Sequence, residues 1–129
     1  RAGKYDNVAF HRVIEGFMAQ TGDVEFGKHA GDTSRAGMGG SDLPNLQAEF
    51  SSQAFKRGTV GMARSQDPNS ANSQFFIMFD DAPHLDGQYT VVGRVVEGMD
   101  VVNKIKRGNS GRNGEVSNPD WMTKVTVEK

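Results

Sequence analysis

Short runs of β-branched and aromatic residues recur along the chain, and each is bounded by glycine, proline or polar turn residues. Such runs favour strands, and the turns between them leave little room for long helices. The sequence predicts strands over residues 8–14, 17–21, 58–64, 74–79, 89–96 and 122–127. Many of the 16 glycines lie in the stretch GDTSRAGMGGSD at residues 31–42. We therefore expect an all-β protein with long surface loops, built as a barrel or a sandwich.

The longer segments between these runs predict different structures. Residues 22–45 are polar and glycine-rich without a clear period, which indicates a loop of a length that is uncommon in compact domains. Residues 46–55 are compatible with a short helical turn. Residues 98–108 predict a helix, because methionine, valine and isoleucine recur there at helical spacing and a glycine follows.

Length, charge and cysteine content exclude several classes of protein. A chain of 129 residues is enough for one domain with a single core. Its 15 basic and 16 acidic residues leave a net charge of −1, so no basic excess indicates a nucleic-acid partner or an acidic membrane surface. No apolar run approaches the roughly 18 residues of a membrane helix. The absence of cysteine excludes disulfides and thiol nucleophiles.

A charged residue stands inside an apolar run at Arg12, within the sequence FHRVI. Charged side chains are rarely placed among apolar neighbours unless they are paired or functional. Phe17 and Met18 follow closely, and alternation along the strand at residues 74–79 places Gln74 and Phe76 on one face. The alternatives for Arg12 are a structural salt bridge or an exposed position on the sheet. The aromatic residues are equally compatible with an ordinary core.

Other catalytic patterns find little support in the sequence. His11, His29 and His84 do not have the spacing of a metal-binding pair, and the glycines at residues 37–40 lack the lysine and serine of a phosphate-binding loop. No G-x-S-x-G motif predicts a hydrolase. Because neighbouring strand residues point to opposite faces, His11 should point away from any site that Arg12 faces, which favours a structural role.

Three long segments stand in a fixed order along the chain. They are FHRVIEGFMAQTGD at residues 10–23, GTVGMARSQDPNSANSQFFIMF at residues 58–79 and LDGQYTVVGRVVEGMDVV at residues 85–102. Together they resemble the cyclophilin-type peptidyl-prolyl cis-trans isomerases, in particular the small bacterial branch. The resemblance implies a single domain over residues 1–129 with an antiparallel eight-stranded barrel capped by helices. It also implies two further strands and a helix ahead of the first motif, so we expect the domain to be N-terminally incomplete.

The resemblance also implies roles for individual residues. Arg12 matches the family's catalytic arginine, and His11 matches a supporting histidine. The positions that match substrate-binding residues are Phe17, Met18, Gln20, Ala63, Arg64, Gln74, Phe76, His84, Leu85 and Tyr89. Four of these correspond to the pocket for the proline ring, namely Phe17, Met18, Phe76 and Leu85. The two glutamines correspond to the polar rim that contacts the substrate backbone, and the pair at positions 63 and 64 to the strand edge beside the preceding peptide.

The implied activity is rotation about X-Pro bonds in proteins and peptides, in support of protein folding and without a cofactor or metal. Two alternatives remain open from sequence: a proline-peptide-binding chaperone or scaffold with little catalysis, and a structural β-barrel with a buried arginine. The expected partners are proline-containing polypeptides, and we expect a monomer. We expect a cytoplasmic location, with the periplasm as the alternative.

One position departs from the resemblance in a way that predicts a drug response. His84 stands where cyclosporin-sensitive eukaryotic members carry tryptophan and many bacterial members carry phenylalanine. The single tryptophan of the chain, Trp121, does not replace it, because it lies near the C-terminus and outside the motif. We therefore expect weak cyclosporin binding with catalysis less affected.

Overall fold

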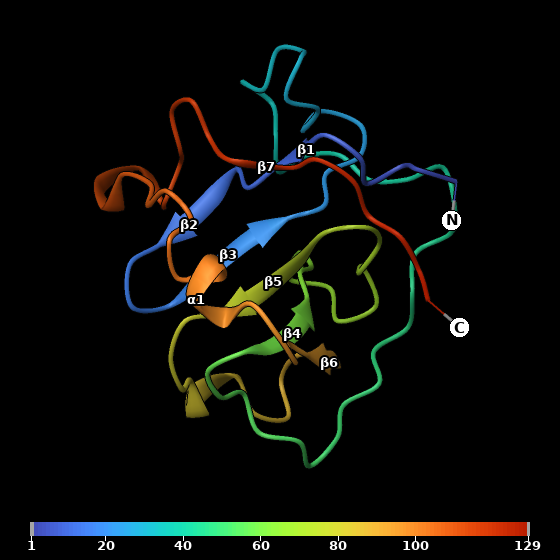
Figure 1. The fold of residues 1–129 in the computed structure, drawn as a ribbon. Helices are drawn as coiled ribbons and strands as arrows, with labels where there is room; N and C mark the ends of the chain where they lie inside the picture. The colour runs from blue at the N-terminus through green and yellow to red at the C-terminus, as the bar shows by residue number, and fades with distance from the viewer. Residues whose placement is uncertain (1, 129) are drawn as a thin grey trace.

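The computed structural model describes residues 2–128, and its fold is mainly β (Figure 1). Its strands are β1 (Val8–Ala9), β2 (Arg12–Ile14), β3 (Met18–Thr21), β4 (Thr59–Met62), β5 (Phe75–Met78), β6 (Val91–Arg94) and β7 (Trp121–Met122). Its helices are the 3-10 turns η1 (Pro83–Leu85) and η2 (Ser110–Arg112) and the α-helix α1 (Met99–Val102). The fold class predicted from sequence is confirmed. None of the helices within the described residues is long and apolar enough to cross a membrane.

A five-stranded antiparallel sheet in the order β2-β3-β5-β4-β6 forms the centre of the molecule (Figure 1). Its register pairs Arg12 with Gln20, and Gln20 with Phe76. Directly opposed residues point to the same face of a sheet, so these three side chains stand in one row across β2, β3 and β5. Gly61 of β4 is the next residue in the row. A side chain there would lie 2.7 Å from the rings of Phe55 and Phe76, so glycine makes room for both.

Side-chain alternation along these strands divides the apolar residues between two cores. One face of the sheet carries core 1, which consists of Met18, Phe55, Phe76, Met78, Ala82 and Leu85. The other face carries core 2, which consists of Phe10, Val13, Ala19, Phe79 and Val116. Phe55 is only 1% exposed although it comes from an irregular segment. Core 1 lies on the face of the sheet that carries Gln20 and Phe76.

The strand predicted over residues 8–14 is divided in two. Phe10 donates its backbone N–H to the carbonyl of Asp120, and the carbonyl of His11 accepts from Val116. These two residues, which lie between β1 and β2, therefore form hydrogen bonds with the C-terminal part of the chain. β1 pairs with β7 in a separate two-stranded sheet, whereas β2 begins the main sheet. The interruption follows from long-range partners that local strand propensity does not reveal.

Three other elements differ from the sequence prediction. Residues 46–55 form no helical turn: Leu46 bridges to Ala71, and the N–H of Phe55 donates to Asp86. The helix predicted over residues 98–108 is confined to α1, and the predicted strand over residues 122–127 is confined to β7. Beyond α1 the Arg107 side chain donates to the carbonyls of Asn103 and Ile105, which further helical turns would otherwise use.

Candidate active site

A pocket of about 170 Å³, the central pocket, opens above core 1 at the row of residues across the main sheet. Nine of the residues singled out from sequence line it: Arg12, Phe17, Met18, Gln20, Ala63, Arg64, Phe76, Leu85 and Tyr89. They come from β2, β3, β5 and η1 and from the segments that flank β3, β4 and β6. The pocket therefore combines an apolar floor with two arginines and one amide on its rim, as sites for small ligands commonly do.

Arg12 makes three hydrogen bonds at the edge of this pocket. Its Nη1 donates to Gln20 Oε1 at 3.1 Å. Its Nε donates to the carbonyl of Asn113 at 3.0 Å, and its Nη2 donates to Asn113 Oδ1, also at 3.0 Å. Partial burial lowers the pKa of the guanidinium from its ordinary value, with Tyr89 opposing the shift. An arginine remains protonated in spite of such a shift, so the pocket contains a permanent, oriented cation.

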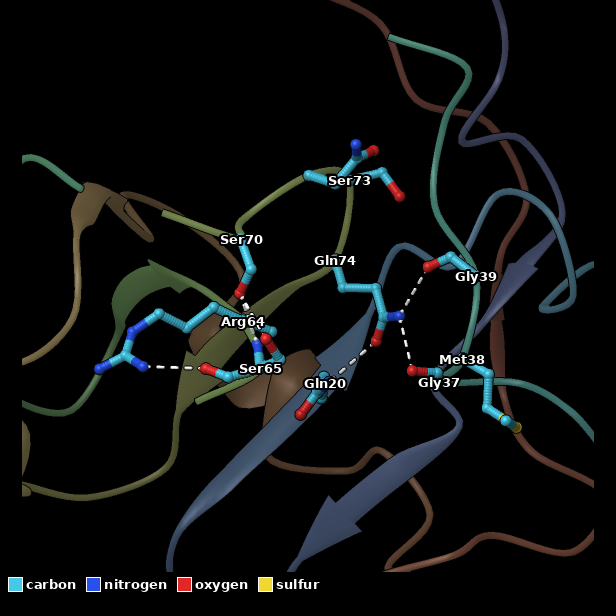
Figure 2. A pocket seen from close by; sticks show the side chains of 11 residues that line it. Gln20, Gly37, Met38, Gly39, Arg64, Ser65, Ser70, Ser73 and Gln74 are labelled. Atoms are coloured by element: carbon cyan, nitrogen blue, oxygen red, sulfur yellow. Dashed lines mark hydrogen bonds between the residues drawn. The ribbon is translucent and has the colours of Figure 1, made fainter. Parts of the chain in front are cut away.

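A chain of amides extends from Arg12 to a neighbouring loop. Gln20 Nε2 donates to Gln74 Oε1 at 2.9 Å, and Gln74 Nε2 donates to the carbonyls of Gly37 and Gly39, each at 2.9 Å. Figure 2 shows this chain across an adjoining pocket of about 240 Å³, which shares Gln20 with the central pocket. In each amide the oxygen faces a donor and the nitrogen faces an acceptor. The orientation of Gln20 beside Arg12 is therefore fixed.

The buried carboxylate of Asp23 fastens the same loop from its other side. Asp23 Oδ1 accepts the N–H groups of Glu25 and Phe26, and Oδ2 accepts those of Gly37 and Gly39. The residue is fully buried. A side chain at Gly39 would lie 2.5 Å from the carboxylate, so only glycine allows this approach. Part of the glycine-rich segment over residues 22–45 is thus ordered, and it forms one wall of the adjoining pocket.

Arg64 separates the central and adjoining pockets. Its guanidinium lies over the ring of Tyr89, with Cζ 4.3 Å from the ring centroid, and its Nη2 donates to the carbonyl of Gln88. Figure 2 shows this guanidinium directed toward Ser65 and away from Gln74. Arg64 therefore acts as a packed wall, whereas Arg12 faces the central pocket.

Three of the residues predicted for the site lie outside the central pocket. Gln74 lines the adjoining pocket. His84 is exposed on η1, and its ring centroid lies 5.7 Å from that of Phe17. His11 is buried, and neither ring nitrogen has a hydrogen-bond partner among the residues that the structure describes. Burial lowers the pKa of His11, the charge of Arg12 lowers it further, and Asp23 opposes both effects.

Sequence reasoning missed Asn113 and Asp23. The Asn113–Gly114 pair is a turn signal, and it gives no indication of a contact with a residue 101 positions away. Asp23 belongs to the first motif but received no role, because its partners lie in a loop without a recognisable pattern. No group of three or more His, Cys, Asp or Glu side chains within residues 2–128 is arranged to hold a metal ion.

Comparison with known proteins agrees with this geometry. The family model described as "Cyclophilin type peptidyl-prolyl cis-trans isomerase/CLD" matches residues 1–127. The chain belongs to this cyclophilin family. A probable peptidyl-prolyl cis-trans isomerase of Brucella abortus (strain 2308) is 66% identical over 130 residues, which cover 99% of this chain and 66% of the relative. The peptidyl-prolyl cis-trans isomerase CYP23 of Arabidopsis thaliana is 38% identical, over 88% of this chain and 50% of that protein.

Solved cyclophilins have the same fold. The crystal structure of cyclophilin AquaCyp293 from Hirschia baltica superposes with a TM-score of 0.74 at 26% identity, over 95% of this chain and 60% of that chain. A Cryptosporidium parvum cyclophilin, crystallised in the presence of the dipeptide Ala-Pro, superposes with a TM-score of 0.77 at 24% identity, over 98% of this chain and 77% of that chain. This cyclophilin chain spans 66% of the length of its Brucella relatives.

Proposed function

We propose that the protein accelerates cis-trans isomerisation of X-Pro peptide bonds, with Arg12 as the catalytic residue. The observation that carries the proposal is the position of a hydrogen-bonded guanidinium on the rim of an apolar pocket floored by Met18, Phe76 and Leu85. A proline ring is apolar and compact, which suits such a floor. Membership of the cyclophilin family supports the same activity.

The proposed chemistry breaks no bond. Rotation about a peptide bond costs about 18–20 kcal/mol because the C–N bond has partial double-bond character. In the twisted transition state that resonance is lost, and the proline nitrogen regains a lone pair. A guanidinium N–H donates to this lone pair more strongly than to the planar ground state, which lowers the barrier by differential binding. No general acid or base is required.

Arg12 retains donors for this task. A guanidinium carries five N–H donors, and three of those on Arg12 are engaged with Gln20 and Asn113. The remaining N–H of Nη1 and the remaining N–H of Nη2 are available to a bound peptide. In our proposal the apolar floor holds the proline ring, and Gln20 and Gln74 contact the peptide backbone on one side. Rotation is then confined to a single bond.

Exchange measurements on a short Ala-Pro peptide test the proposal. We expect Arg12→Ala to lower kcat/KM by roughly 10²–10³-fold, by analogy with the loss of one transition-state donor. Arg94→Ala is the matched control, because Arg94 is an exposed arginine at the end of β6. Line-shape or exchange NMR gives the rates, and circular dichroism confirms that each variant is folded.

Two outcomes would contradict the proposal. A folded Arg12→Ala variant with unchanged kcat/KM would remove Arg12 from the mechanism. Wild-type protein that binds the peptide without accelerating exchange would instead favour the alternative of a proline-peptide-binding chaperone or scaffold. A structural barrel predicts neither binding nor exchange, and amide chemical shifts would then be unchanged when the peptide is added.

The proposed partners are proline-containing polypeptides, and the Ala-Pro dipeptide present with the Cryptosporidium relative is a reasonable first probe. We further propose that the protein acts as a monomer, since a pocket on one face of the sheet does not require a second copy to complete it. We retain the cytoplasm as the proposed compartment, with the periplasm as the alternative. Light scattering and cell fractionation test these two points.

We also propose that cyclosporin binds weakly. His84 occupies a position at which the drug-sensitive relatives carry tryptophan, and its exposed ring offers less apolar area beside Phe17. We expect His84→Trp to bind the drug more tightly than the wild type. A calorimetric titration measures both affinities, and tight nanomolar binding by the wild-type protein would contradict this proposal.

A further inference from the structure

The segment over residues 108–116, which we name the 108–116 loop, is hydrogen-bonded to the middle of β2 and to the residue that precedes this strand. Val13 donates to the carbonyl of Gly114, Gly108 donates to the carbonyl of Val13, and Val116 donates to the carbonyl of His11. The sequence of this stretch, GNSGRNGEV, is polar and rich in glycine, as surface loops commonly are. Its backbone hydrogen bonds instead place it alongside the strand that carries Arg12.

One glycine allows the two ends of this loop to approach each other, and a second allows the loop to approach β2. A side chain at Gly108 would lie 1.9 Å from the carbonyl oxygen of Gly114, and a side chain at Gly114 would lie 2.7 Å from Ile14. Contacts this short are not tolerated by other residues. The 108–116 loop is therefore packed against β2 at a distance that brings its backbone, and not only its side chains, within reach of Arg12.

Asn113 at the tip of this loop contacts one whole edge of the guanidinium. Its backbone carbonyl accepts from Arg12 Nε and its side-chain Oδ1 accepts from Arg12 Nη2, both at 3.0 Å. The two acceptors match the paired donors on that edge, which fixes the plane of the guanidinium as well as its position. Asn113 supplies two of the three hydrogen bonds of Arg12, and Gln20 supplies the third.

We propose that Asn113 is a positioning residue, which orients the free N–H groups of Arg12 toward the central pocket. The inference rests on the proposed isomerase function. An arginine side chain has several rotatable bonds, and a catalytic donor must be held close to its productive geometry before the transition state forms. Gln20 alone restrains one nitrogen. With Asn113 in place, rotation about the Cδ–Nε bond and displacement of the whole side chain are both opposed.

A merely structural role for Asn113 makes a different prediction. The residue follows η2 in a left-handed conformation with φ of 58°, which asparagine tolerates and glycine adopts freely. Asn113→Gly therefore preserves the turn and the backbone carbonyl acceptor while removing Oδ1. If the turn alone matters, this variant retains full activity.

Three variants separate these roles. Asn113→Gly should lower kcat by about ten- to a hundredfold with little change in KM, because the floor of the pocket is untouched. Asn113→Asp retains an acceptor at the same place and should keep kcat within about threefold of the wild type. Asn118→Gly is the matched control, since Asn118 also has a positive φ of 50° but lies in a different part of the molecule, beside Trp121. It should be fully active.

A spectroscopic measurement gives a second, independent result. In ¹⁵N-labelled protein, the Arg12 side-chain N–H signals should exchange faster with water in Asn113→Gly than in the wild type or in Asn118→Gly. Wild-type kcat in a folded Asn113→Gly variant would overturn the inference, as would unchanged Arg12 signals. Failure of the proposed function has a different signature, namely a wild-type protein that does not accelerate exchange at all.

Discussion

At the scale of single residues, His11 and Arg12 have different surroundings although they are neighbours in the sequence. Arg12 points into the central pocket, and His11 packs beneath the 22–45 loop, where a side chain added at Gly37 would lie 3.2 Å from the imidazole ring. Both residues also line a further pocket beside Gly37 and Asn113, so the alternation expected from sequence separates them only in part. The burial of His11 against Gly37 is compatible with the structural role that the sequence favours.

Burial of His11 predicts a specific dependence of stability on pH. Its folded-state pKa is lowered, with burial as the largest cause, so below about pH 6.5 the unfolded chain binds a proton that the folded protein resists. The unfolded state then holds more protons, and the free energy of unfolding falls as the pH decreases. We expect this component, at most about 1.4 kcal/mol per pH unit, to be absent from His11→Asn.

Urea unfolding between pH 7.5 and pH 5 measures the effect. His11→Asn also loses packing at every pH, so the change of stability with pH is the informative quantity and its absolute value is not. His84→Asn serves as the control, because His84 is an exposed histidine. Identical pH dependence in His11→Asn and the wild type would show that the titration of His11 does not contribute to the pH dependence of stability.

Sequence alone identified the residues that line the central pocket, but only one of the two residues that orient Arg12. Arg12, Phe17 and Phe76 were found because they belong to long motifs, and the structure brings them to one pocket. Asn113 contacts Arg12 across 101 positions of sequence. A hydrogen bond between segments so far apart depends on the register of the whole sheet, and no local pattern encodes it.

At the scale of elements, the strands of the main sheet were predictable and their connections were not. Residues 17–21, 58–64, 74–79 and 89–96 each contain an observed strand, since β-propensity and bounding glycines act locally. Residues 46–55 show the limit of local reasoning. Their backbone bonds to Ala71, Asn69, Thr90 and Asp86, and these distant partners outweigh the weak helical preference of the segment.

The 22–45 loop is an element whose order depends on one carboxylate. Asp23 accepts four backbone N–H groups while fully buried. In Asp23→Asn an amide NH₂ replaces one oxygen and faces donors that it cannot bond. We expect the free energy of unfolding to fall by about 2–4 kcal/mol, since donors left unsatisfied in the interior are costly. Thermal and urea unfolding measure the loss.

Asp32→Asn is the matched control for this prediction. Asp32 is an exposed aspartate in the same loop and accepts a backbone N–H from Ser34, so its replacement should change stability by no more than about 0.5 kcal/mol. Hydrogen exchange adds local detail: the amides of Gly37 and Gly39 should lose protection in Asp23→Asn. Equal stability of the two variants would contradict the assigned role of Asp23.

At the scale of the whole molecule, the two faces of the main sheet have different relations to the site. Core 1 lies directly beneath the central pocket: the Phe55 ring centroid is 5.8 Å from that of Phe76 and 6.5 Å from that of Tyr89, and both partners line the pocket. Core 2 lies on the opposite face and includes Phe79, whose ring packs against Arg107 at 3.9 Å. Stability should therefore depend on both cores, and function on one of them.

A pair of core variants tests this division. Phe55→Leu and Phe79→Leu each remove part of an aromatic ring from a site no more than 4% exposed, so each should lower the free energy of unfolding by roughly 1–2 kcal/mol. Only Phe55→Leu should weaken binding of an Ala-Pro peptide and lower kcat/KM, because only its ring supports Phe76 and Tyr89. Both variants are compared well below their unfolding temperatures, so that the folded fraction is complete. If Phe79→Leu impaired the site as strongly as Phe55→Leu, the two cores would be coupled through the sheet and the pocket would depend on the packing of the entire molecule.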